Sequence, residues 1–313
     1  MSSSSTVEPL DESQSSLRGR LILLARDVKF SHTVFALPFA LLAAFMACAS
    51  AGRLPPPSLL LLVVVCMVLA RTAAMTFNRW ADRRFDGLNP RTASRAIPSG
   101  RLSGGFVLGS ALVCGAAFIM ATAGFWFIDA NPWPLLFSPL ILAWVMGYSV
   151  TKRFTWLCHL VLGIALAIST LAAAIAVQPS YLGRGEPYVL AAMVLFWVAG
   201  FDVIYALMDV DVDRRDGLQS MPARWGIERA LWMSRSMHLL ALAALCLLCW
   251  LSGVLGVGFS LAIGVVCGLL LLEHLLIWRS PTSRIHMVFF TLNGMISLIL
   301  GGAGIIDTVS RVR

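Results

Sequence analysis

Charged residues are scarce in this chain of 313 residues. They make up 13% of it, whereas 58% is hydrophobic and the mean hydropathy is +0.82. A soluble domain of this length carries about twice that charged fraction. The sequence also lacks the ten-residue alternating segments of a transmembrane β-barrel. Apolar runs of roughly twenty residues recur instead, so we expect an all-α, polytopic membrane protein.

Other absences exclude further classes of site. The seven cysteines lie in or beside apolar runs and suggest no disulfide framework; Cys246 and Cys249 form a CxxC, but within an apolar span where buried thiols are expected. The five histidines are scattered, form no zinc cluster, and are expected to pack or to lie at the membrane interface. Residues 1–17 are polar and Ser-rich, which predicts a disordered tail before a single membrane domain at 18–313.

The apolar runs predict nine transmembrane helices, and the basic residues predict their orientation. The predicted spans are roughly 30–50, 58–77, 104–128, 134–150, 155–177, 187–208, 236–254, 257–278 and 285–306. Nineteen of the 24 Lys and Arg residues fall on one side of them. This asymmetry predicts an inner-membrane protein with its N-terminus and the loops 78–103 and 209–235 in the cytoplasm, and its C-terminus outside. Topology and anionic lipid then account for the net charge of +8, and no nucleic-acid partner is expected.

Two polar stretches suggest an internal repeat. NRWADRRFDGL at 78–88 resembles DVDVDRRDGL at 209–218, with Asn78 matching Asp209 and Asp82 matching Asp213 at an offset of 131 residues. The offset moves the register by four helices, an even number. We therefore predict two parallel four-helix repeats plus one helix, enclosing a central cavity. Chance similarity of two Arg/Asp loops is the alternative.

The spacing of these acidic residues indicates a shared site. Asn78, Asp82 and Asp86 are four residues apart, as are Asp209 and Asp213, so each set lies on one face of a helix end. Crowded carboxylates take up protons unless a cation lies between them. A salt-bridged, solvated helix end would explain one such cluster, but two at equivalent positions favour a common function.

Magnesium and a diphosphate fit this pattern of residues. Mg²⁺ prefers oxygen ligands and is usually held by one or two carboxylates together with substrate phosphates. Basic side chains could bind the remaining phosphate oxygens; the candidates are Arg91, Arg95, Lys152, Arg153 and Arg224. A diphosphate at the mouth of an apolar helical cavity predicts a lipid diphosphate substrate, with its tail among the spans.

These stretches resemble the motifs of a known family. NRWADRRFD resembles the first Asp-rich motif, N-x-x-x-D-x-x-x-D, of the UbiA superfamily of intramembrane aromatic prenyltransferases, and DVIYALMDVDVD resembles the second. NPRTASRAIPSGRLS, GYSVTKRFTWLCHLVLG and KFSHTVFALPFALL are also similar to that family. The first span and TKRFTWLCHLVLG are most similar to 4-hydroxybenzoate polyprenyltransferase-like members. A menaquinone-branch subgroup shares these sequence patterns. The resemblance covers nearly the whole chain.

The resemblance implies an activity and a set of site residues. It implies Mg²⁺-dependent transfer of a polyprenyl group from polyprenyl diphosphate to a ring carbon of an aromatic acid, 4-hydroxybenzoate in ubiquinone biosynthesis, or alternatively a naphthoate in menaquinone biosynthesis. By matching position, Asn78, Asp82 and Asp86 would form the first magnesium–diphosphate cluster, and Asp209 and Asp213 the second. Lys152 and Arg153 would bind diphosphate, and Asp202 and Tyr205 would face the reacting centre.

Four residues have expected roles near the aromatic acceptor. Asp202 lies within a span, where an ionisable residue is costly and usually functional. It would orient the acceptor phenol or accept a proton; alternatively, it pairs structurally with Arg71, which the same offset aligns with it. Tyr148 and Tyr205 are candidates to stabilise an allylic cation.

Two other functions are alternatives to the prenyltransferase. A membrane transporter would need its ionisable groups near the bilayer midplane, on broken helices, whereas here they lie at span ends on one side. The CDP-alcohol phosphotransferase signature begins D-x-x-D-G-x-x-A-R, and residues 213–217 match its start. Ala223 and Arg224 come too late in the chain for that signature, which excludes this second enzyme class.

Overall fold

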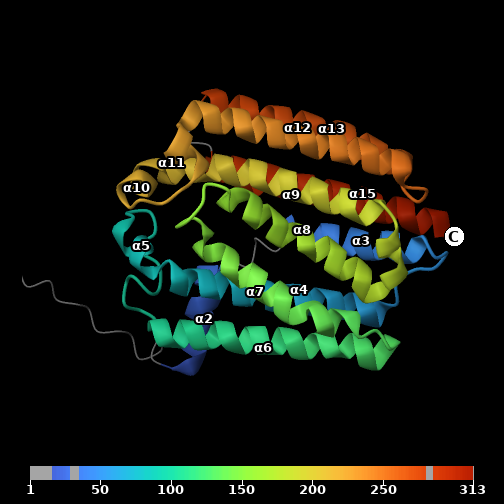
Figure 1. Ribbon diagram of the computed structural model, residues 1–313, viewed down its shortest axis with the longest axis horizontal. Helices are drawn as coiled ribbons and strands as arrows, with labels where there is room; N and C mark the ends of the chain where they lie inside the picture. Colours follow the sequence, from blue (N-terminus) through green and yellow to red (C-terminus); the bar gives the residue numbers. More distant parts are fainter. Residues whose placement is uncertain (1–15, 29–34, 280–284, 313) are drawn as a thin grey trace, which may run out of the picture.

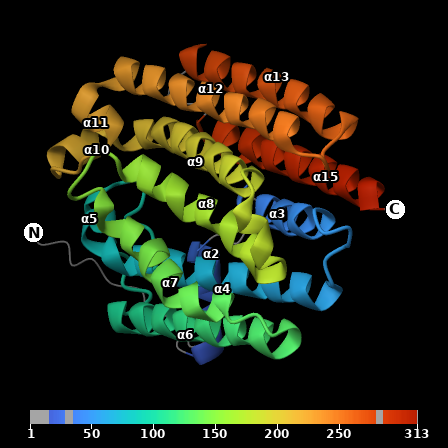
Figure 2. The same cartoon turned by 45° about the vertical axis from the view of Figure 1, so that its right-hand side comes forward.

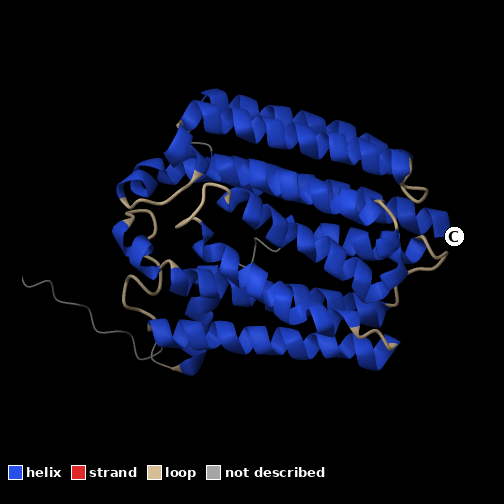
Figure 3. Ribbon diagram, in the orientation of Figure 1, coloured by secondary structure: helices blue, strands red, loops and turns tan. Residues whose placement is uncertain are grey.

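The computed structural model describes residues 16–28, 35–279 and 285–312, and every regular element in these ranges is a helix (Figure 3). The helices are α2 (Leu17–Val28), α3 (Leu37–Ala49), α4 (Pro57–Ala81), α5 (Arg83–Leu88), α6 (Gly104–Asp129), α7 (Trp133–Thr151), α8 (Cys158–Val177), η2 (Pro179–Gly183), α9 (Glu186–Tyr205), η3 (Ala206–Asp209), α10 (Val210–Arg215), α11 (Met221–Trp225), α12 (Ile227–Leu251), α13 (Val257–Arg279), α14 (Ile285–Met287), η4 (Val288–Leu292) and α15 (Asn293–Val312).

The long helices lie side by side in one bundle (Figures 1 and 2). The short helices α5, α10 and α11 gather at one end of it, at the left of Figure 1, and the C-terminus lies at the opposite end. The prediction of an all-α membrane protein with a central cavity is confirmed. We refer to the end that carries α5 and α10 as the motif end.

The number of spans is not confirmed as nine. Eight segments in the described ranges are long and apolar enough to cross a membrane. The first predicted span, 30–50, corresponds to α3, an apolar helix of 13 residues, and residues 29–34 before it lie outside the described ranges. The predicted disordered tail, 1–17, also lies outside them as far as residue 15, while Leu17 already begins α2.

Local signals explain where several helices begin. Pro57 opens α4, where the fixed φ of proline suits the first turn and its missing N–H is no loss. Ser103 precedes α6, and its side chain accepts a hydrogen bond from the backbone N–H of Phe106, which satisfies one unpaired donor of the first turn. Large apolar side chains such as Phe127 and Trp250 are exposed on the outside of the bundle, as a surface in hydrocarbon requires.

The packing agrees with two parallel halves. The second long helix of each half, α4 and α9, ends at the motif end (Figure 1). Short helices follow each of them: α5 follows α4, and η3 and α10 follow α9. α4 packs against α6 and α7, and α9 packs against α8 and α12. The two Asp-rich stretches therefore lie at the same end of the bundle although they are far apart in the sequence.

A backbone contact brings α8 and α9 together. A Cβ atom added to Gly163 on α8 would lie 2.4 Å from the carbonyl oxygen of Leu195 on α9. Only a residue without a side chain permits this approach. Two residues after Leu195, the buried indole Nε1 of Trp197 donates a 2.9 Å hydrogen bond to Oδ1 of Asn293, which ties α9 to α15. These contacts fix α9, the helix that carries Asp202.

Candidate active site

A cavity of about 460 Å³ lies among the helices and is reached by side chains of both motifs. It follows α8 from Cys158 almost to the end of that helix, at Ala176. Thirteen of the fourteen predicted site residues line it: Arg71, Asn78, Asp82, Asp86, Arg91, Arg95, Tyr148, Lys152, Arg153, Asp202, Tyr205, Asp209 and Asp213.

Arg224 is the exception, since it is not one of the residues that line the cavity. It is exposed on α11, where Nη1 donates a 3.0 Å hydrogen bond to Oε1 of Gln219. The sequence placed Arg224 near the second motif because few residues separate them. The structure places it on α11, outside the lining of the cavity.

The first motif spans a junction between two helices. α4 ends at Ala81, and Asp82 connects it to α5. The backbone N–H of Asp82 donates to the carbonyl of Asn78, and that of Asp86 donates to the carbonyl of Asp82. Helical hydrogen bonding therefore continues through the junction and keeps the three side chains on one face. Nδ2 of Asn78 also donates to Oδ2 of Asp82 at 2.9 Å.

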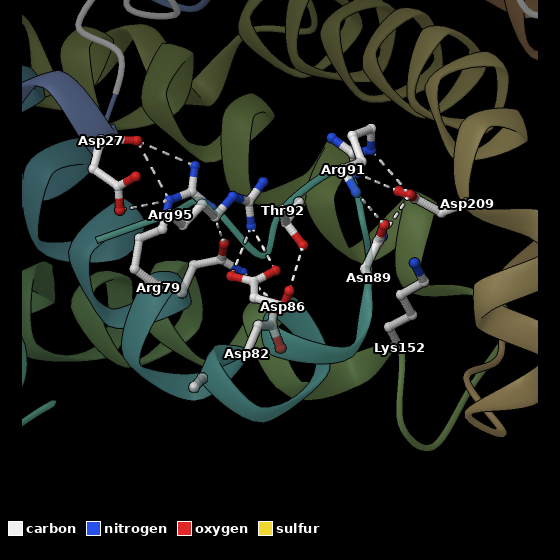
Figure 4. A network of polar contacts seen from close by, with 12 residues as sticks. Asp27, Arg79, Asp82, Asp86, Asn89, Arg91, Thr92, Arg95, Lys152 and Asp209 are labelled. Carbon is white, nitrogen blue, oxygen red and sulfur yellow. Dashed lines mark hydrogen bonds and ion pairs between the residues drawn. The ribbon is translucent and has the colours of Figure 1, made fainter. Parts of the chain in front are cut away.

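Each motif carboxylate is paired with a basic side chain (Figure 4 shows two of these contacts, Arg95 with Asp86 and Arg91 with Asp209). The shortest N–O distances are 3.3 Å for Arg153–Asp82, 2.7 Å for Arg95–Asp86, 2.5 Å for Arg91–Asp209 and 2.7 Å for Lys152–Asp213. These cations offset the repulsion between neighbouring carboxylates.

Two of the connections cross between the halves. Arg91 follows the first motif, yet its guanidinium contacts both carboxylate oxygens of Asp209 in the second, and Asn89 donates to the same side chain at 2.9 Å. Lys152 and Arg153 follow α7 directly; Lys152 pairs with the second motif and Arg153 with the first. The two motifs therefore face one cavity from opposite halves.

Burial affects the ionisation of these groups unequally. It raises the pKa of Asp82, and the Asp86 carboxylate raises it further, while the hydrogen bond and charge of Arg153 oppose the shift. Burial alone would lower the pKa of Lys152, but the Asp213 carboxylate more than offsets this and the pKa rises. Asp82 therefore retains a cost of ionisation that a bound cation would relieve.

Deeper in the cavity, Asp202 contacts a histidine. Its Oδ2 lies 2.6 Å from Nδ1 of His159, which is 2% exposed. The ion pairs of the described residues include none between Arg71 and Asp202, so the structural bridge considered for these two residues is not formed. The sequence predicted only a packing or interfacial role for His159. Its one available signal was its place in the segment GYSVTKRFTWLCHLVLG, seven residues after Lys152.

Aromatic side chains surround the space between Asp202 and the motifs. The ring of Tyr205 lies 4.2 Å from that of Phe289, centroid to centroid, and the Arg91 guanidinium lies 5.6 Å from the Tyr205 ring. Phe201 and Phe35 extend this cluster, with ring centroids 5.6 Å apart. Tyr148 lies on α7, with its hydroxyl 3.8 Å from Sδ of Met75. The three phenylalanines were not predicted, because they lie on separate segments of the chain within ordinary apolar runs.

The donor set suits magnesium better than a transition metal. In the part of the chain that the structure describes, no three side chains of His, Cys, Asp or Glu converge as a preformed metal site. Mg²⁺ does not require one, because it usually keeps water ligands and takes one or two carboxylates together with substrate phosphates. The oxygen-only donors of the two motifs fit an ion whose remaining ligands come from a diphosphate.

Comparisons with known proteins agree with this geometry. Residues 36–295 match the UbiA prenyltransferase family. The 4-hydroxybenzoate octaprenyltransferase of Psychromonas ingrahamii is 30% identical over 237 residues, which cover 75% of this chain and 78% of that protein. The apo structure of a UbiA homolog from Aeropyrum pernix K1 is similar, with 31% identity, a TM-score of 0.77, and coverage of 89% of this chain and 98% of that one. A UbiA homolog from Archaeoglobus fulgidus bound to DMAPP and Mg²⁺ shares the fold, with 16% identity, a TM-score of 0.70, and coverage of 91% and 99%. The chain belongs to the UbiA prenyltransferase family.

Proposed function

We propose that this protein transfers a polyprenyl group from polyprenyl diphosphate to a ring carbon of an aromatic acid, with 4-hydroxybenzoate as the acceptor in a quinone pathway. The observation that carries the proposal is the meeting of two Asp-rich motifs and four basic side chains at one apolar cavity. The names of relatives at about 30% identity support this choice of acceptor. The basic residues at the motif end support its placement on the cytoplasmic side of the inner membrane.

The basic side chains would bind and stabilise the leaving group. Arg91, Arg95, Lys152 and Arg153 carry donors that now contact carboxylates and would turn to diphosphate oxygens. Magnesium held by the two motifs (Asn78, Asp82, Asp86, Asp209 and Asp213) would supply positive charge that stabilises the diphosphate as it leaves. The arginines would likewise stabilise the negative charge that develops on the diphosphate.

The apolar part of the cavity would protect the prenyl cation. When the C1–O bond breaks, its electron pair leaves with diphosphate and an allylic cation remains. The faces of Tyr205 and the neighbouring phenylalanines can stabilise that cation, and an apolar lining limits the access of water that would quench it. A ring carbon of the acceptor then bonds to C1, loses its proton, and regains aromaticity from the C–H electron pair.

Product analysis tests the proposal directly. Membranes containing the protein would receive polyprenyl diphosphates of several lengths and a panel of acids that includes 4-hydroxybenzoate and a hydroxynaphthoate. Mass spectrometry should detect the prenylated benzoate, and membranes with the Asp209→Asn variant should give none. Prenylation of the naphthoate alone would assign this protein to the menaquinone branch of quinone biosynthesis. If the protein carried solute across liposome membranes and formed no prenylated product, it would be a transporter and not an enzyme.

A further inference from the structure

His159 has both ring nitrogens engaged in a buried position. It lies in the first turn of α8 and is 2% exposed. Its Nδ1 lies 2.6 Å from Oδ2 of Asp202, and its Nε2 accepts a 3.3 Å hydrogen bond from the backbone N–H of Met221. The metal and diphosphate chemistry described above uses neither contact.

The two contacts determine where the imidazole carries its proton. A backbone N–H can only donate, so Nε2 of His159 must present a lone pair to Met221. The ring proton is therefore on Nδ1, which donates it to Asp202. In this tautomer the Nδ1–H is directed at Asp202 and the Nε2 lone pair at Met221.

Asp202 is consequently held with one oxygen occupied. Oδ2 accepts the hydrogen bond from His159, and over the described ranges Oδ1 accepts none. The side chain is 23% exposed and lines the cavity, so Oδ1 is the oxygen left for a bound molecule. His159 itself is closed to substrate, because Nδ1 already carries a proton and the Nε2 lone pair is directed at Met221.

We propose that His159 is a positioning residue that holds Asp202 so that its Oδ1 accepts the proton lost by the aromatic ring. The inference rests on the proposed prenyl transfer. After the ring carbon has bonded to C1 of the prenyl group, its C–H bond breaks. The proton passes to Oδ1 of Asp202, and the electron pair restores the aromatic ring. The carboxylic acid returns its proton to water when the product leaves.

The same imidazole also reaches toward the second motif. Met221 follows Ser220, whose hydroxyl donates a 2.6 Å hydrogen bond to Oδ2 of Asp213. Gln219, one residue earlier, donates its N–H to the carbonyl of Lys152. Loss of His159 could therefore disturb diphosphate binding as well. The test must measure the KM for prenyl diphosphate separately from turnover.

Two substitutions of His159 separate positioning from proton transfer. In His159→Gln, the amide NH₂ can donate to Asp202 and the amide oxygen can accept from Met221, but glutamine does not titrate. His159→Leu removes both hydrogen bonds. We expect the Leu variant to lose about 10- to 100-fold in kcat, with a much smaller change in the KM for prenyl diphosphate. The Gln variant should keep most of the wild-type turnover.

A double variant tests whether His159 acts through Asp202. Asp202→Asn should lower kcat at least as far as His159→Leu, and adding His159→Leu to it should cause no further loss. All variants are compared in detergent at equal amounts of protein, with melting temperatures as the measure of folding. If the Leu variant does not fold, the turnover of the His159→Gln variant alone tests the proposal.

Several results would overturn the inference. It fails if His159→Leu turns over like the wild type, if a folded His159→Gln variant loses more than about tenfold, or if the losses from Asp202 and His159 multiply. These outcomes differ from failure of the proposed function, in which the wild-type protein itself prenylates no aromatic acid. In that case the role of His159 in ring deprotonation falls with it.

Discussion

The substitution Gly163→Ala tests what sets the distance between His159 and Asp202. α8 and α9 meet backbone to backbone at this glycine, where an added Cβ would lie 2.4 Å from the carbonyl oxygen of Leu195 and 3.3 Å from its Cα. A backbone atom cannot rotate away as the end of a side chain can. Because ordinary contact begins near 3.5 Å, the methyl group must move α8 relative to α9 by about 1 Å.

The structure gives the size of the expected effect. His159 lies one turn before Gly163 on α8, and Asp202 lies two turns after Leu195 on α9. A displacement of about 1 Å would stretch their 2.6 Å contact beyond hydrogen-bonding distance. Misplacement of that size at a reacting group lowers turnover by about 100-fold, and overpacking costs about 1–3 kcal/mol of stability.

The assay compares Gly163→Ala with a matched glycine in open space. Gly268 lies within α13, and a Cβ added there meets nothing within 4 Å. Both variants would be purified in detergent, and their melting temperatures and kcat for prenyl transfer measured. We expect Gly163→Ala to lower both the melting temperature and kcat. Gly268→Ala should leave both near their wild-type values. If Gly163→Ala keeps wild-type turnover, the close approach of α8 and α9 does not position Asp202.

Three further predictions concern the motif end. Asp209→Asn should abolish prenyl transfer in a protein that still inserts and purifies, because the charge that Arg91 contacts through two nitrogens is lost; near-normal product formation would remove Asp209 from the metal site. EDTA should stop turnover and added Mg²⁺ should restore it, and activity that survives chelation counts against a divalent ion. Arg153→Ala should raise the KM for prenyl diphosphate more than that for the aromatic acid, with Arg153→Lys as the control that keeps the charge; the opposite pattern would place Arg153 at the acceptor.

The sequence predicted the positions of the motifs well because they repeat. Asn78 and Asp209 share an offset with Asp82 and Asp213, and an even number of helices separates the two sets. That pattern was enough to place both sets at one end of the bundle, where α4 and α9 end. The number of spans was harder to predict. The apolar run at 30–50 predicts a full span, whereas α3 within it has only 13 residues.

The partners of the charged residues were not predictable from spacing. Arg91 lies five residues after Asp86, yet it crosses to Asp209 because the loop after α5 turns toward the other half. Repeat symmetry offered Arg71 as one alternative partner for Asp202. Equivalent positions in two halves need not touch, and Asp202 instead contacts His159, whose helix packs against its own through Gly163. Such contacts depend on how the helices pack, which is a property of the whole bundle.

The ion pairs at the motif end give a physical reason for a metal requirement. Each of the four basic side chains that could bind diphosphate now contacts one motif carboxylate. A diphosphate that drew these cations away would leave partly buried carboxylates unpaired, and removal of a buried partner is costly. Ionised Asp82 would be destabilised further, since burial and Asp86 already raise its pKa. A divalent cation that arrives with the diphosphate replaces the lost positive charge, so binding of the two should be coupled.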